Sequence, residues 1–165
     1  MTGTIGERIA GLDWPRMQVD IGMRGWTTTG EILTRTESET LAGYYNDDIH
    51  FRSRVVMSRH GFGRGEYRYF SYPLPDLVAG LRQELYGRLV GIAESWRVPL
   101  GGGEPFPLEH RDYLARCNSA GQKRPTPLLL RYGPGDYNCL HQDLYGDHVF
   151  PPAGGIPAVA ATDGV

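Results

Sequence analysis

Residues 131–151 read RYGPGDYNCLHQDLYGDHVFP, and the centre of this stretch is the triplet His141-Gln142-Asp143. The apolar run over residues 128–132 predicts one strand, and a second strand is predicted over residues 137–143, after the GPGD turn. Alternate side chains of a strand point to the same face, so the imidazole of His141 and the carboxylate of Asp143 are expected to emerge side by side. The spacing predicts two adjacent ligands for one metal ion.

This pair of ligands favours iron. Two histidines and one carboxylate on one face of the ion form the facial triad of non-haem Fe(II) oxygenases, which leaves positions for cosubstrate and O₂. One alternative is a surface histidine and aspartate beside a turn. Another is a zinc site, since zinc-type ligand atoms are also found on Cys117, Cys139, His141 and His148, although no C-x-x-C pair is present.

The residues around the triplet resemble the Fe(II)/2-oxoglutarate-dependent oxygenase superfamily. Its prolyl-hydroxylase-like members show Y-x-x-G-x-x-Y-x-x-H-x-D, and the chain has Tyr132, Gly135, His141 and Asp143 at those offsets, with Asn138 in place of the second tyrosine. The block 135–146 looks more closely like a bacterial family of these oxygenases that is suspected of acting on nucleic acids. The resemblance covers roughly residues 36–150.

The resemblance implies an oxidoreductase, a dioxygenase with Fe(II) and 2-oxoglutarate as cofactors and ascorbate in support. It implies that His141 and Asp143 ligate the iron, and that Tyr132 and Asn138 contact 2-oxoglutarate through hydrogen bonds to a carboxylate. The reaction would be hydroxylation or oxidative demethylation of a substrate, coupled to conversion of 2-oxoglutarate to succinate. For Tyr132 the alternative is a core tyrosine with a satisfied hydroxyl.

The residues after Asp143 lack part of the superfamily's pattern. A distal histidine and a basic residue for the far carboxylate of 2-oxoglutarate are expected, but residues 144–165 contain His148 and no lysine or arginine. A double-stranded β-helix needs about eight strands, and at most three are predicted after residue 128. We therefore expect a C-terminally truncated enzyme that is inactive by itself. The alternative is a catalytically inactive fragment or a non-catalytic binding module.

The expected fold class is α+β, with N-terminal helices and a β-hairpin packed on an incomplete double-stranded β-helix (jelly-roll) core. Residues 1–150 are expected to form this partial oxygenase domain. Residues 151–165 (PPAGGIPAVAATDGV) have no pattern that would pack, so a disordered tail is expected there. Unpaired strands of the incomplete core favour self-association.

The predicted β-hairpin consists of residues 52–58 (RSRVVMS) and 66–72 (EYRYFSY), joined by a glycine-rich linker. Between residues 50 and 72 lie five arginines and one glutamate, formally +4, in a chain whose net charge is −2. One interpretation is a solvated hairpin whose arginines pair with acids elsewhere. The other is a flap that meets an anionic substrate through Arg54, Arg59 and Arg64, which favours nucleic acid over protein.

Apolar spacing and caps predict four helices, over residues 4–13, 41–45, 76–96 and 108–118. Pro15 is expected to end the first, and Thr36-x-x-Glu39 has the form of a capping box for the second. The third carries an apolar stripe expected to face the core, formed by Leu77, Leu81, Leu85, Leu89, Ile92 and Trp96.

Composition excludes two classes of protein. No apolar run approaches the roughly 20 residues that a membrane helix needs, and the N-terminus lacks the apolar segment of a secretory signal. Two cysteines cannot form a disulfide framework. The expected location is therefore cytoplasmic.

Overall fold

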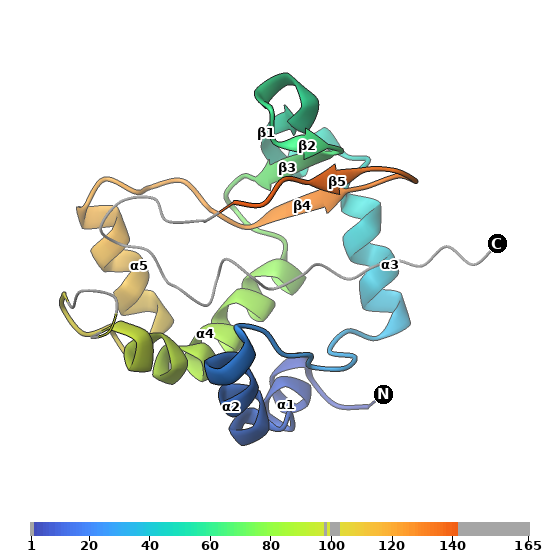
Figure 1. The fold of residues 1–165 in the computed structure, drawn as a ribbon. Coiled ribbons are helices and arrows are strands. Elements are labelled where there is room, and N and C mark those ends of the chain that lie inside the picture. The colour runs from blue at the N-terminus through green and yellow to red at the C-terminus, as the bar shows by residue number, and fades with distance from the viewer. Residues whose placement is uncertain (1, 98, 100–102, 142–165) are drawn as a thin grey trace.

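The computed structural model describes residues 2–97, 99 and 103–141. The strands gather at one end of the molecule and helices α1, α2 and α4 at the other, with α3 running between the two ends (Figure 1). The helices are α1 (Ile5–Ala10), α2 (Trp14–Arg24), α3 (Arg35–Tyr44), α4 (Asp76–Arg97) and α5 (His110–Ser119). The strands are β1 (Phe51–Val56), β2 (Gly63–Arg64), β3 (Glu66–Phe70), β4 (Leu128–Arg131) and β5 (Tyr137–Asn138), and 3-10 helices cover Asp48–His50 and Met57–His60.

Two small antiparallel sheets form the strand end. The first has the order β1-β3-β4, with Val56 opposite Glu66 and Glu66 opposite Arg131, and the second pairs β2 with β5. The predicted hairpin is confirmed as β1 and β3. The mixture of helix and antiparallel sheet confirms the α+β class, while the jelly-roll core stays a prediction. Strand β5 ends at Asn138 and is therefore shorter than the predicted strand over residues 137–143. Asp143 and His148, both candidate metal ligands from the sequence, lie outside the described residues.

Glycines in the linker between β1 and β3 permit the close approach of later strands. Gly63 has φ +117°, and a Cβ there would overlap the carbonyl oxygen of Tyr137 on β5. Gly65 has φ +114°, and a Cβ there would lie 2.7 Å from Cδ1 of Tyr132. Both positions need a residue without a side chain, so these glycines allow β5 and Tyr132 to dock on the linker.

The N-terminal region contains one more helix than predicted. Pro15 does not end a helix but lies in the first turn of α2, where its missing N–H costs no hydrogen bond. Asp13 is the N-cap of α2, and its side chain accepts a hydrogen bond from the backbone N–H of Arg16 at 3.1 Å. The first helix ends instead at Ala10, with Gly11 as its C-cap.

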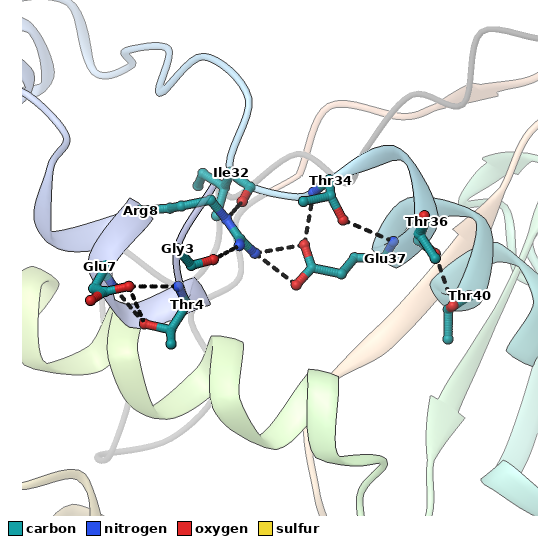
Figure 2. A network of polar contacts seen from close by, with 9 residues as sticks. All are labelled: Gly3, Thr4, Glu7, Arg8, Ile32, Thr34, Thr36, Glu37 and Thr40. Carbon is teal, nitrogen blue, oxygen red and sulfur yellow. Dashed lines mark hydrogen bonds and ion pairs between the residues drawn. The ribbon is translucent and has the colours of Figure 1, made fainter. Parts of the chain in front are cut away.

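The capping box of α3 lies two residues before the predicted one. The side chain of Thr34 accepts from the N–H of Glu37, and the Glu37 carboxylate accepts from the N–H of Thr34 at 2.7 Å. Arg8 of α1 reaches the same carboxylate through Nη2, at 2.7 and 2.6 Å, and donates from Nε to the Ile32 carbonyl (Figure 2). This contact between α1 and α3 explains why Thr34, and not Thr36, caps the helix.

Among the described elements, helix α4 supplies the largest share of the buried apolar residues. Its buried residues are Val78, Tyr86, Leu89, Val90, Ile92 and Ala93, whereas Leu77, Leu81, Leu85 and Trp96 of the predicted stripe are half-buried. The predicted stripe is thus only partly correct. Helix α4 packs against α1 and α2 as well as α5, so its buried face is wider than one stripe. Within the described ranges, no helix has the length and apolarity required to cross a bilayer.

Candidate functional site

Glu66 is a buried acid at the junction of the two strand pairs of the larger sheet. Its carboxylate accepts a hydrogen bond from the hydroxyl of Tyr45 at 3.0 Å and one from Nε of Arg54 at 2.7 Å, and it forms an ion pair with Arg131. Burial alone would raise the pKa of Glu66, but the hydrogen bonds from Arg54 and Tyr45 and the charge of Arg131 hold it below its usual value. Glu66 is therefore ionised at neutral pH and joins β1, β3 and β4.

Two guanidinium groups lie close to the ring of Tyr45. The centre of its ring is 4.6 Å from Cζ of Arg131 and 4.9 Å from Cζ of Arg68, both within cation–π range. Arg68 in turn forms an ion pair with Asp48. Positive charge from β3 and β4 is thus held beside one aromatic ring.

Next to this network is an open pocket of about 530 Å³, lined by Gly65, Glu66, Arg131, Tyr132, Gly133 and Asp136. Tyr132 is 44% exposed, so its alternative role as a core tyrosine is wrong. Partial burial and the nearby charge of Asp136 raise the pKa of the Tyr132 phenol. The phenol stays protonated at neutral pH and is able to donate a hydrogen bond to an anion in the pocket.

His141 is exposed and lies three residues after the end of β5. Its Nδ1 is 2.8 Å from the carbonyl oxygen of Cys139. A carbonyl can only accept, so Nδ1 is the donor in this hydrogen bond. Metal-binding histidines commonly have this arrangement, because the bond fixes both the tautomer and the orientation of the ring.

The structure brings only some of the predicted site residues together. Tyr132 lines the pocket, whereas Asn138 lies on β5 opposite Gly63, and neither Asn138 nor His141 is among the lining residues. Asp143 lies outside the described residues, so its predicted place beside His141 stays a prediction.

The zinc alternative finds no support in the described part of the chain. No group of three or more His, Cys, Asp or Glu side chains comes close enough there to hold a metal ion. Cys117 is buried in α5, and Cys139 lies just beyond β5.

Three of the five hairpin arginines are engaged by contacts within the protein. Arg52 donates to the carbonyl of Pro125 at 3.2 Å, Arg54 is held by Glu66 of the hairpin itself, and Arg68 by Asp48. The interpretation that the hairpin arginines pair with acids elsewhere is thus confirmed for Arg68 alone among these three. Contact of Arg54 with a substrate stays a prediction.

Arg59 and Arg64 differ from these three. Both are exposed, and neither forms an ion pair with any acid among the described residues. Sequence reasoning missed their aromatic neighbours, His60 and Phe62, whose rings stack with centroids 5.4 Å apart. The signal was the alternation of basic and aromatic residues in RHGFGR, residues 59–64.

A family model described as "Oxygenase, catalysing oxidative methylation of damaged DNA" matches residues 65–153, more than half of the 165 residues. The chain belongs to this oxygenase family. The matched segment begins at Gly65 and contains β3, the pocket, β5 and His141.

Two curated proteins are similar to the chain. They are the uncharacterized proteins MT2286 and Rv2227 of Mycobacterium tuberculosis, from strains CDC 1551 / Oshkosh and ATCC 25618 / H37Rv, and each is 49% identical over 82 residues. The similarity covers 50% of this chain and 35% of each relative, so the matching part spans about a third of their length. No solved structure matches the chain.

Proposed function

We propose that the chain is part of an Fe(II)- and 2-oxoglutarate-dependent oxygenase that acts on DNA. The observation that carries this proposal is the family match over residues 65–153, which include Tyr132 and His141. The contact between Nδ1 of His141 and the carbonyl of Cys139 supports a ligand role, because such a bond fixes the orientation of a metal-binding ring. The family's description, an oxygenase acting on damaged DNA, supports the substrate class.

In this proposal His141 and Asp143 hold Fe(II), and Tyr132 and Asn138 donate hydrogen bonds to 2-oxoglutarate. The donor set suits the metal, since one neutral imidazole and one carboxylate are two members of a facial triad. The Tyr132 phenol is protonated at neutral pH, as any tyrosine is and as a donor to a carboxylate must be, and partial burial raises its pKa further. Fe(II) and 2-oxoglutarate together would supply O₂ activation and oxidation of a C–H bond, with succinate as coproduct.

The charge distribution supports an anionic substrate. Arg59 and Arg64 place two guanidinium groups on the linker that pairs with β5, and His141 follows β5 by three residues. The pairing of β2 with β5 connects the linker that carries these arginines to the segment that leads to His141. Phosphates bound by the arginines would therefore be held on a part of the protein that is hydrogen-bonded to the segment of the proposed ligand.

Metal binding tests the proposal directly. An anaerobic titration of the 165-residue chain with Fe(II) should show binding that weakens at least about tenfold in His141→Ala, because a ligand is lost. His50→Gln removes another histidine of the strand end and should leave the affinity unchanged.

Equal Fe(II) affinity of the wild-type chain and His141→Ala would refute the proposed metal role. DNA binding without any Fe(II) binding would favour the alternative of a non-catalytic binding module. The inactivity of this chain by itself stays a prediction. Succinate formation that requires Fe(II) and 2-oxoglutarate, and that disappears in His141→Ala, would contradict it.

A further inference from the structure

An exposed aromatic surface lies on the linker between β1 and β3. The rings of His60 and Phe62 stack at 5.4 Å with their planes 24° apart. Phe62 is 46% exposed, Tyr137 on the neighbouring strand β5 is 55% exposed, and His60 is exposed as well. Three ring systems are therefore available to solvent within one short stretch of surface.

Backbone hydrogen bonds hold these rings in place. The N–H of Phe62 donates to the carbonyl of Met57 at 3.1 Å, and its own carbonyl accepts from the N–H of Cys139 at 2.9 Å. Two residues further on, Arg64 lies directly opposite Tyr137 in the β2–β5 pair. Residues that face each other across antiparallel strands have neighbouring side chains, so the His60–Phe62 stack and the Arg64–Tyr137 pair adjoin.

Two positive charges flank the rings. Arg59 and Arg64 are exposed, and no acid in the described ranges forms an ion pair with either, in contrast to Arg54 and Arg68 of the same hairpin. A guanidinium group without an acidic partner gains most from a phosphate, because it gives up no existing ion pair.

We propose that His60, Phe62 and Tyr137 form a stacking platform for unpaired bases of single-stranded DNA, whose phosphates are bound by Arg59 and Arg64. This rests on the proposed function and adds the form of the substrate. Flat aromatic faces beside unpartnered arginines are the combination used by proteins that bind single strands, since every base has a π-face. In a duplex the base faces are covered by their neighbours, so the platform has nothing to stack on.

The platform is physically continuous with the proposed metal site. Tyr137 and Asn138 form β5, and the chain then passes Cys139, which is bonded to the linker, before it reaches His141. Bases stacked on Tyr137 would thus be held by the segment that also carries the proposed iron ligand, and Phe62 is hydrogen-bonded to that segment at Cys139.

Fluorescence anisotropy with the 165-residue chain tests this proposal. The probes are a labelled oligothymidine, an abasic oligonucleotide of the same length and a duplex. Phe62→Ala should weaken binding of the oligothymidine by about fivefold to a hundredfold, the loss expected for one stacked base, and should leave binding of the abasic strand unchanged. Phe62→Tyr should retain affinity, and Tyr137→Ala should repeat the effect of Phe62→Ala. Trp26→Ala, which removes an aromatic ring that is 59% exposed far from the platform, is the matched control and should change nothing.

The arginines are expected to behave differently. Arg59→Gln combined with Arg64→Gln should weaken oligothymidine and abasic binding alike, and should reduce the slope of log K against log salt by about 1.4, for two phosphates of a single strand. Equal affinity of the wild-type chain for duplex and oligothymidine would overturn the proposal, as would an equal effect of Phe62→Ala on both single strands or no effect of it. The assay contains neither iron nor 2-oxoglutarate, so its failure is separate from failure of the proposed oxygenase activity.

Discussion

Replacing Glu66 by glutamine keeps the size of the side chain and removes the negative charge that faces Arg54 and Arg131. The variant leaves two guanidinium groups close together around a neutral amide, and Tyr45 keeps a carbonyl oxygen to which it can donate. We expect the sheet order β1-β3-β4 to survive at neutral pH with a lower free energy of unfolding.

The size of the loss follows from burial. Removing one partner of a fully buried ion pair costs about 3–5 kcal/mol. The side chain of Glu66 is only 11% exposed, but those of Arg54 and Arg131 are 52% and 56% exposed, so water stabilises the arginines that lose their partner. We therefore expect a loss of about 2 kcal/mol, which corresponds to a fall in Tm of about 4–8 °C for a chain of this size.

The pH dependence gives a second readout. The pKa of Glu66 is lower in the folded state than its usual value of about 4.5, so the stabilisation is complete above that value and is lost as the pH falls through the folded pKa. Urea unfolding should thus separate Glu66→Gln from the wild-type chain at neutral pH and bring them together in strong acid. Glu39→Gln breaks the exposed pair with Arg35 and is the control, with an expected loss of at most about 0.5 kcal/mol. A loss for Glu66→Gln no larger than that of the control would refute the reasoning.

Three further changes probe other parts of the fold. Gly65→Ala puts a Cβ at φ +114° and 2.7 Å from the ring of Tyr132, so it should destabilise the chain by about 1–3 kcal/mol in urea unfolding, and unchanged stability would contradict the close approach. Burial and the charge of Arg82 lower the pKa of His110 from 6.5 to about 4, so the free energy of unfolding should decline as the pH falls from 6.5 to about 4. His110→Asn should flatten that decline, and an equal pH dependence of the variant and the wild-type chain would contradict this prediction. Thr34→Ala should cost about 1 kcal/mol as the loss of a helix cap, whereas Thr36→Ala should cost little, and the reverse order in thermal unfolding would show that the cap is misplaced.

Elements that are specified by neighbouring residues in the sequence could be predicted. The strands β1 and β3 follow from β-branched and aromatic residues on either side of a glycine-rich linker, and α4 from its apolar spacing. The cap of α3 shows the limit of such patterns, since both Thr34-x-x-Glu37 and Thr36-x-x-Glu39 fit the motif. Arg8, from a different helix, decides between them by binding Glu37. Pro15 was misread because proline ends a helix in one position and begins it in another.

The candidate site was predictable only in part for the same reason. His141 and Tyr132 belong to a motif with fixed spacing, and they could be found without the structure. The network around Glu66 draws Tyr45, Arg54 and Arg131 from separate segments, and no spacing in the sequence relates them. The pairing of β2 with β5 that completes the platform is likewise a contact between distant segments.

The sheet order has a consequence for the chain as it leaves the ribosome. Strand β3 is central, with β1 made just before it and β4 made only after α4 and α5. A nascent chain can close the local β1–β3 hairpin early, but until β4 arrives β3 presents a bare edge on which a second chain could pair. Glu66 then has Arg54 as its partner from the start, while Arg131 reaches it late. An acid and an arginine on the open hairpin keep that edge charged during synthesis, and β4, the last strand of this sheet to emerge, brings the arginine that closes it.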